Sequence, residues 1–285
     1  MIQAIPNIYV GRRIMEQKIL RELQLTELEI LKTVDALCMK EGIQYYLVGG
    51  TLLGAIRHKG FIPWDDDLDI AIPRADYNRF IEICLCGGLG KNYELHHIST
   101  DKNYWLPFAK IRKKNTLFNE TDIKMLDCRK GIFIDVFPLD SCAKNSGLTY
   151  HLRAKIVKTL NFVINMRVRK CKIKTIQAKV IYLITRPFSI KTITLFRDTL
   201  CTKQKSGKYI INYASNYKYT KQTMDKSIYG KGIKVSFENG KFCAPILYIK
   251  YLEQLFENWK QLPPEEERRN HNPTNIIFDL KKEGR

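Results

Sequence analysis

The sequence predicts an α/β fold in which a mixed, twisted sheet has flanking helices and carries a basic helical insertion. Short apolar runs of strand length, such as Tyr46–Val48 and Gly131–Asp140, occur beside longer stretches of helical apolar spacing, such as Arg13–Glu41. The segment Ser141–Met224 differs from the rest, since it holds 18 Lys and Arg residues and a single acid, Asp198. A hydrophobic content of 45% with 11% aromatic residues suits a globular core and argues against bulk disorder.

The net charge of +19 predicts an anionic partner, which could be nucleic acid, an acidic membrane surface or a phosphorylated substrate. Residues Met1–Arg13 lack the apolar core of a signal peptide, and no run of 18 or more apolar residues occurs. The eight cysteines are scattered without zinc-type spacing, which favours reduced, mostly buried thiols. We therefore expect a cytoplasmic protein, with peripheral contact at the inner face of the cytoplasmic membrane left open.

The stretch Tyr45–Ile72 carries the first candidate site. Its first strand ends at Gly49-Gly50, where the backbone can approach a ligand closely. We expect Thr51 to cap a helix over Leu52–Arg57, whose N-terminal amides and dipole favour a phosphate group. Taken alone, a Gly-Gly pair after a strand more often marks only a turn.

A second strand is expected to begin near Asp67. Because side chains alternate along a strand, Asp67 and Asp69 share one side, and Leu68, Ile70 and Ile72 form an apolar face on the other. Two neighbouring carboxylates repel each other unless a cation lies between them. Mg²⁺ or Mn²⁺, which prefer oxygen ligands, would relieve that repulsion, and phosphoryl transfer requires such a pair beside a phosphate site.

A helix over Arg74–Cys84 and a strand over Tyr93–Ile98 are expected next. In the following segment, Trp105–Lys113, the side chains of Lys110 and Arg112 share one face of a predicted strand. These two bases either neutralise phosphate charge near the carboxylates or form an ordinary solvated basic edge.

The segment Gly131–Asp140 is a nearly continuous apolar run that contains an isolated carboxylate, Asp135. Burying an isolated charge in a strand is unfavourable without a partner. A metal ion, a catalytic proton transfer or a structural hydrogen bond would each explain this residue. Asp140 follows Pro138 and is expected to be a helix cap or a turn residue.

Within the basic segment Ser141–Met224, apolar residues recur at helical spacing over Leu152–Val168 and Thr175–Thr185. Bases such as Lys155 and Lys158 surround the apolar side of the first helix. Basic amphipathic helices suit an anionic membrane interface or a lipid-linked substrate, and they also suit nucleic acid. A solvated cationic surface is the third alternative, and the residues leave all three open.

The C-terminal part is predicted to begin with a hairpin over Lys234–Cys243 that turns at Asn239-Gly240, followed by a helix over Pro245–Trp259. We divide the chain into three parts: a catalytic core (1–143), a basic helical subdomain (144–232), and a hairpin, helix and tail that return to the core (233–285).

The run from Gly49 to Asp69, GGTLLGAIRHKGFIPWDDDLD, resembles the signature of the LicD family. These bacterial phosphocholine transferases are related to the fukutin-type ribitol-phosphate transferases and have the nucleotidyltransferase fold. The resemblance is clear over Leu23–Asp140 and looser over Phe242–Asn272, and similar sequences also contain the Phe-Ala-Lys-Ile-Arg stretch around Lys110. It implies a nucleotidyltransferase-like sheet for this chain.

The resemblance also implies metal-dependent transfer of a phospho-alcohol, by default phosphocholine from CDP-choline, to a hydroxyl of a cell-surface glycan precursor such as that of lipopolysaccharide or teichoic acid. CMP would leave, and the glycan acceptor could be lipid-linked. Asp67, Asp69 and Asp135 would be catalytic and would ligate Mg²⁺ or Mn²⁺. The residues that would bind the phosphates of the CDP-alcohol are Gly49, Gly50, Thr51, Arg57, Lys110 and Arg112.

Two alternatives use the same motif. The first is a nucleotidyltransferase that moves a nucleoside monophosphate to a small molecule or RNA, and the second is an inactive nucleotide- or membrane-binding module. Nucleic acid is not the expected partner, although the charge of +19 keeps RNA among the alternatives.

Overall fold

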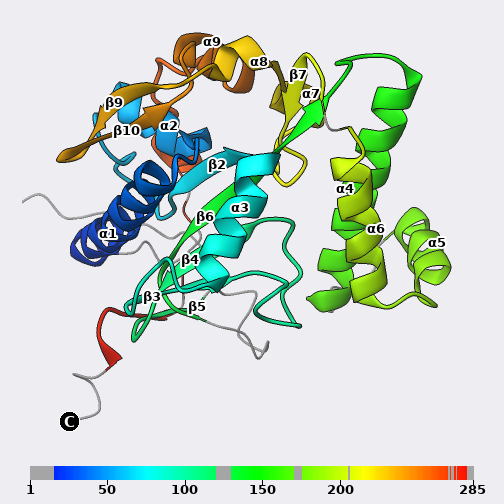
Figure 1. The fold of residues 1–285 in the computed structure, drawn as a ribbon, viewed down its shortest axis with the longest axis horizontal. Coiled ribbons are helices and arrows are strands. Elements are labelled where there is room, and N and C mark those ends of the chain that lie inside the picture. The colour runs from blue at the N-terminus through cyan, green and yellow to red at the C-terminus, as the bar shows by residue number, and fades with distance from the viewer. Residues whose placement is uncertain are drawn as a thin grey trace, which may run out of the picture.

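The computed structural model of the chain describes residues 16–119, 130–169, 175–204, 206–268, 270, 273 and 275–280. A sheet runs through the middle of the molecule, and the helices of the basic segment stand together at one side of it (Figure 1). The six described cysteines are free thiols, and all except Cys86 are buried, as the sequence indicated. Cys128 and Cys171 lie outside the described residues.

The central sheet contains, in spatial order, β1 (Tyr46–Leu47), β2 (Asp69–Pro73), β6 (Phe133–Cys142), β4 (Ala109–Lys113) and β3 (Tyr93–His96). Strands β2 and β6 run parallel, whereas the β1–β2, β6–β4 and β4–β3 pairs are antiparallel. A mixed sheet with flanking helices confirms the predicted α/β class.

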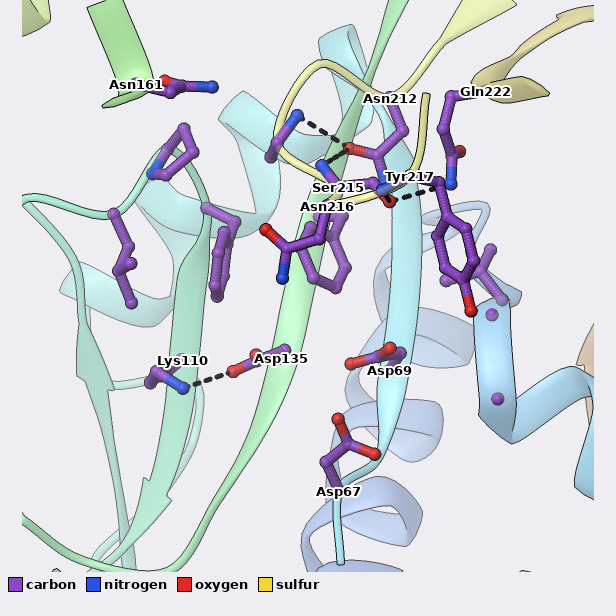
Figure 2. Close-up of a pocket in the computed structure, with 18 of the residues that line it drawn as sticks. Asp67, Asp69, Lys110, Asp135, Asn161, Asn212, Ser215, Asn216, Tyr217 and Gln222 are labelled. Carbon is purple, nitrogen blue, oxygen red and sulfur yellow. Dashed lines mark hydrogen bonds and ion pairs between the residues drawn. The ribbon is translucent and has the colours of Figure 1, made fainter. Parts of the chain in front are cut away.

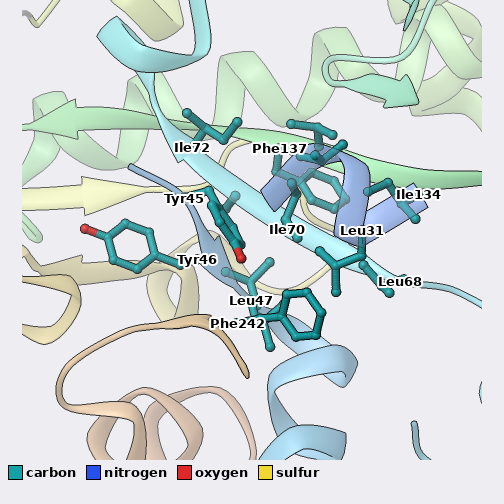
Figure 3. Packing of buried hydrophobic residues seen from close by; sticks show 14 of the residues in the cluster. Leu31, Tyr45, Tyr46, Leu47, Leu68, Ile70, Ile72, Ile134, Phe137 and Phe242 are labelled. Atoms are coloured by element: carbon teal, nitrogen blue, oxygen red, sulfur yellow. The ribbon is translucent and has the colours of Figure 1, made fainter. Parts of the chain in front are cut away.

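Four helices surround this sheet and the adjoining C-terminal elements: α1 (Gln17–Glu41), α2 (Gly49–Arg57), α3 (Arg74–Leu85) and α9 (Tyr248–Leu255). Helix α1 packs on β4 and β6, whereas α2 packs on β2 and α9, and α3 on β2, β3 and β6. Figure 3 shows Leu31 of α1 close to Leu68 and Ile134 in the core between helix and sheet. The apolar stripe predicted along α1 is therefore the face that covers the sheet.

The prediction that Thr51 caps helix α2 is wrong. The helix begins at Gly49, and Val48 is its N-cap residue. Thr51 lies buried in the first turn, where its hydroxyl accepts a hydrogen bond of 2.8 Å from the backbone N–H of Asp69. This bond joins α2 to the first residue of β2.

Strand β6 connects two parts of the sheet. Its first half pairs with β2 and β4, and its last residues pair with β7 (Tyr209–Ile211), which also pairs with β8 (Thr223–Asp225). Asp140 lies inside β6, so its assignment as a helix cap or turn residue is wrong. The buried Asp140 carboxylate instead accepts hydrogen bonds of 2.7 and 2.9 Å from the Arg74 guanidinium, and this ion pair is why the acid can occupy a strand.

The basic segment folds mainly into α4 (Leu148–Val168), α5 (Ile176–Thr185) and α6 (Ile190–Thr202), followed by the short helix α7 (Tyr219–Gln222). Two of these helices were predicted, and α6 was not. Helix α4 packs on α5 and α6, and α6 also touches β6. Among the described residues, each helix is too short or too polar to span a bilayer.

The C-terminal part returns to the core. After α8 (Lys226–Tyr229), strands β9 (Ile233–Phe237) and β10 (Gly240–Ala244) form the expected hairpin, which packs on β1 and α2, and β11 (Asn275–Ile277) pairs with β5 (Leu117–Asn119). Gly240 pairs with Phe237, so the turn residues are Glu238 and Asn239, one position earlier than predicted. The Glu238 carboxylate fixes this turn, because it accepts hydrogen bonds from Arg21 and from the backbone of Phe61.

Candidate active site

A cavity of about 860 Å³ opens where β2, β6, the start of α2 and part of the basic segment meet (Figure 2). The predicted site residues that line it are Gly49, Gly50, Asp67, Asp69, Lys110 and Asp135. A volume of this size is near the upper end for small-molecule and cofactor pockets. The structure therefore gathers six of the nine predicted residues around one space.

Sheet register brings the carboxylates together. Asp69 is the first residue of β2, and Asp135 is its direct partner on the parallel strand β6. The backbone N–H of Asp135 donates to the carbonyl oxygen of Leu68 at 2.9 Å, which continues this pairing toward Asp67. Asp67 precedes the strand instead of beginning it, yet its side chain lies at the same cavity beside Asp69 in Figure 2.

The two glycines leave space for carboxylates. A Cβ atom on Gly49 would lie 3.2 Å from Oδ2 of Asp69, and one on Gly50 would lie 2.8 Å from Oδ2 of Asp65. Gly49 also has a φ of +56°, which side chains rarely adopt. Steric crowding by the two carboxylates thus explains why glycine occupies both positions. The phosphate-binding role of the pair stays a prediction.

Lys110 and Arg112 both lie over the ring of Phe133 but have different hydrogen-bond partners. The Nζ atom of Lys110 donates to Oδ1 of Asp135 at 2.8 Å and lies over the ring of Phe133. Arg112 is also buried, donates to Nδ1 of His96 and to the carbonyl of Gly131, and lies outside the cavity lining. Lys110 therefore belongs to the cavity together with the carboxylates. Arg112 instead links β4 to β3 and to the segment before β6, outside the cavity lining.

Arg57 and Thr51 also lie outside the cavity lining. Arg57, at the end of α2, donates to the carbonyl oxygens of Trp259 and Gln261, which ties the helix to the C-terminal segment. Thr51 holds the backbone of Asp69, as described above. Both residues support elements of the site, and neither side chain contributes to the surface that a phosphate would meet in the cavity.

Acidic groups crowd beneath the cavity floor. Burial, together with the negative charge of Asp67, raises the pKa of Asp65 well above its usual range. Glu27 on α1 is 2% exposed, and its Oε2 atom has no hydrogen-bond partner among the described residues. Burial also raises the pKa of Glu27, with smaller contributions from the charges of Asp65, Asp66, Asp67 and Asp135. A cation bound at this floor would reduce the electrostatic repulsion between Asp65, Glu27 and the neighbouring carboxylates.

The oxygen donors of this floor fit Mg²⁺ or Mn²⁺, which take carboxylate ligands from a few protein groups and fill the remaining positions with substrate phosphates and water. Within the described part of the chain, no three carboxylate, imidazole or thiolate groups lie so that they could hold a metal ion by themselves. The metal-binding role of Asp67, Asp69 and Asp135 therefore stays a prediction, and substrate phosphates would have to complete the coordination of a cation.

The basic segment contributes a wall that sequence reasoning missed. Helix α4 and the loop 212–217 line the upper part of the cavity, mainly with uncharged polar side chains. The polar residues of this wall are Lys158, Asn161, Asn165, Arg169, Asn212, Ser215, Asn216, Tyr217 and Gln222. The loop reaches the cavity because β7, which ends at Ile211, pairs with the far end of β6. Burial and the charges of nearby Asp69, Asp65 and Asp67 raise the pKa of Tyr217 to about 12.

The chain is similar to several known proteins. The family described as "LicD/FKTN/FKRP, nucleotidyltransferase domain" matches residues 42–147. The lipopolysaccharide cholinephosphotransferase LicD of Haemophilus influenzae is 32% identical over 271 residues, which cover 90% of this chain and 97% of that protein. An uncharacterized protein of Rickettsia typhi is 46% identical over 25% of this chain and 21% of its own length. The human ribitol 5-phosphate transferase FKRP is 43% identical over 53 residues, 19% of this chain and 10% of that protein.

Proposed function

This chain belongs to the LicD family of transferases, and we propose that it transfers a phospho-alcohol, phosphocholine from CDP-choline by default, to a hydroxyl of a cell-surface glycan precursor. The similarity to the Haemophilus influenzae cholinephosphotransferase extends over nearly the whole of both chains, which supports a common type of reaction. It also favours lipopolysaccharide over teichoic acid as the kind of glycan, because that relative is named for lipopolysaccharide.

The observation that carries the proposal is the side-by-side pairing of Asp69 and Asp135 on parallel strands, with Asp67 beside them at one cavity. This arrangement places three carboxylates where a donor diphosphate can reach them. A divalent cation bound there would neutralise the charge that develops on the diphosphate as CMP leaves. Asp67 and Asp69 are the residues that would hold it. Of the two roles open to the Asp135 carboxylate, a share in the cation or acceptance of a proton, we assign it the second.

Residues of the protein itself would position the reactants and accept the proton. The Lys110 ammonium orients the Asp135 carboxylate through their 2.8 Å contact. In the proposed reaction this carboxylate accepts the proton of the attacking hydroxyl. Gly49 and Gly50 keep the start of α2 open to the donor phosphates, whose charge the helix N-terminus favours. Positioning within the cavity provides the rest of the rate enhancement, without a covalent intermediate.

The direct test is nucleotide release. The purified protein with CDP-choline and Mg²⁺ or Mn²⁺ should form CMP, and EDTA should stop the reaction. Pyrophosphate release from nucleoside triphosphates, with no CMP from CDP-choline, would contradict the proposal and favour a nucleotidyltransferase. Absence of both reactions with a full set of CDP-alcohols would favour the inactive binding module.

We also propose that the enzyme binds reversibly to the inner face of the cytoplasmic membrane through α5. Its exposed apolar residues recur at helical spacing, with Ile176, Leu183 and Ile184 exposed by 81%, 62% and 65%. Exposed bases at Lys179 and at two positions beyond the helix, Arg186 and Lys191, accompany this face. An apolar face bordered by bases is typical of a helix that lies in an anionic membrane interface.

Charge reversal tests this contact. The triple variant Lys179→Glu, Arg186→Glu and Lys191→Glu should no longer co-sediment with vesicles that contain phosphatidylglycerol, and high salt should weaken binding of the wild type. Lys158 and Arg167 are unsuitable for this test, because both donate hydrogen bonds to backbone carbonyls within the protein. Equal binding to neutral phosphatidylcholine vesicles, or binding to neither, would contradict the proposal.

A further inference from the structure

The loop 212–217 is held in one conformation above the carboxylates. The Oδ1 atom of Asn212 accepts hydrogen bonds from the backbone N–H groups of Ala214 and Ser215 at 3.0 and 3.1 Å. From α4, Lys158 donates to the carbonyl oxygens of Ser215 and Tyr217. A loop that is fixed before a ligand arrives loses little conformational entropy on binding, which suits a recognition element.

Two further side chains complete this scaffold. Asn161 of α4 donates to the carbonyl of Tyr213 at 3.2 Å, and Gln222 donates to the hydroxyl of Ser215 at 2.8 Å. Much of the polar wall is therefore engaged in positioning the loop. Asn216 has a different orientation, since Figure 2 shows its amide directed into the open middle of the cavity, above Lys110 and Asp135.

Apolar side chains line the same cavity as this amide. The rings of Phe108 and Phe137 have centroids 4.4 Å apart, and both line the cavity together with Pro107 and with Phe162 of α4. Phe162 is 51% exposed, so part of its ring is available for contact. An amide that both donates and accepts, beside apolar rings, is complementary to a sugar, which presents hydroxyl groups at its edge and C–H groups on its faces.

We propose that α4 and the loop 212–217 form the acceptor subsite of the enzyme, in which Asn216 binds hydroxyl groups of a neutral sugar ring and Phe162 packs on its face. The subsite rests on the proposed function, because it assigns the acceptor to this half of the cavity. In Figure 2 Asn216 lies above Asp135, and Tyr217 of the same loop lies above Asp69, so the subsite faces the carboxylates. The proposed function assigns the donor diphosphate to Asp67 and Asp69. A sugar hydroxyl held by Asn216 is thus delivered toward the carboxylate that accepts its proton.

Sugar binding can be measured without turnover. Saturation-transfer difference NMR with methyl β-D-galactopyranoside and methyl α-D-glucopyranoside should show transfer from the wild-type protein to ring protons of at least one glycoside. Saturating CMP with Mg²⁺ should leave that signal in place, because the nucleotide occupies the other half of the cavity. Asn216→Ala and Phe162→Ala should each reduce it at least fivefold.

Asn145→Ala is the matched control, since Asn145 is exposed before α4 and lies outside the cavity lining. Thermal melting of the variants establishes that each is folded. Absence of transfer to both glycosides, or equal signals in wild type and both cavity variants, would overturn the inference. Displacement of the glycosides by CMP would also overturn it, because this half of the cavity would then hold the donor nucleoside. CMP release from CDP-choline, measured separately, shows whether the proposed function itself has failed.

Discussion

The core around the carboxylates and the basic segment Ser141–Met224 build opposite sides of one cavity by different means. In the core, sheet register and buried contacts fix each reactive group, as with Asp69 and Asp135 on paired strands. The basic segment leaves large apolar residues exposed, such as Leu183, yet hydrogen bonds from α4 hold the loop that lines the cavity. The difference fits the division of work that we propose, in which the core performs the chemistry and the basic segment binds the acceptor.

Charge is divided in the same way. Burial, and after it the charges of neighbouring carboxylates, raises the pKa of Asp65 and of Glu27 at the cavity floor, although the whole chain carries a net charge of +19. Two bases of Ser141–Met224, Lys158 and Arg169, line the opposite wall of the cavity, and Lys110, itself a core residue, contacts Asp135. An acidic floor that faces these bases suits a bound cation together with an anionic donor.

The largest effect is expected inside the core, for Asp135→Ala. Its removal deprives the Lys110 ammonium, which is 4% exposed, of an ion-pair partner. Breaking a buried pair by removing one partner costs about 3–5 kcal/mol of unfolding free energy. Transfer activity should also fall at least about 100-fold. Chemical denaturation and CMP-release assays measure the two quantities.

Asp69→Asn is the matched variant for this prediction. It should lose as much activity while its unfolding free energy stays within about 1 kcal/mol, because it keeps the side-chain shape and removes one charge from a crowded floor. An Asp135→Ala protein that is as stable as Asp69→Asn would contradict the role assigned to the Lys110 pair.

A smaller effect, on the stability of the loop 212–217 alone, is expected in the basic segment for Lys158→Met. Burial lowers the pKa of this lysine, and its ammonium braces the loop through two carbonyl oxygens. Without it, the backbone amides of Ala214 and Ser215 should exchange with deuterium at least about tenfold faster, which corresponds to roughly 1.4 kcal/mol. Lys155→Met, at an exposed position on the same helix, should leave exchange unchanged. Equal deuterium exchange in the two variants would contradict the prediction that Lys158 of α4 stabilises the loop.

The smallest effect is expected for Glu27→Gln, and it concerns pH. The folded state raises the pKa of Glu27, so the folded protein binds the proton more tightly than the unfolded chain does. Wild-type stability should therefore fall as pH rises above about 4.5, the ordinary range of this group, toward the raised folded value. The glutamine variant should lack this loss and melt a few degrees higher at pH 7.5 than wild type. Melting curves from pH 5 to 8 that run parallel for both proteins would contradict this.

The sequence predicted the core well because its signals are local. Alternation around Asp67 and Asp69, and the isolated carboxylate in an apolar run at Asp135, indicated strands with acids at one site. Their proximity depends on the pairing of β2 with β6, and in the sequence only the family resemblance implied that Asp135 lies with Asp67 and Asp69. The start of α2 was placed too late, since Thr51 has the composition of a cap but bonds to Asp69 instead.

Residues whose roles depend on distant partners were not predictable in this way. Spacing indicated that Lys110 and Arg112 share a strand face, but only the fold shows that one meets Asp135 and the other His96. The loop 212–217 is placed by the pairing of β7 with β6, between segments about 70 residues apart in the chain. Its Asn and Ser residues are ordinary loop residues in the sequence, so no local signal connects Asn216 to the carboxylates.

Electron paramagnetic resonance of Mn²⁺ tests the central claim most directly, because it reports cation binding at the carboxylate floor without requiring the acceptor. Titration of the wild-type protein with Mn²⁺ in the presence of CDP-choline should remove the signal of free Mn²⁺ until the site is filled. Asp67→Asn and Asp69→Asn should each weaken this binding at least about tenfold, whereas Asn216→Ala on the opposite wall should leave it unchanged. Mn²⁺ binding that is equally strong in wild type and in both aspartate variants would contradict the account.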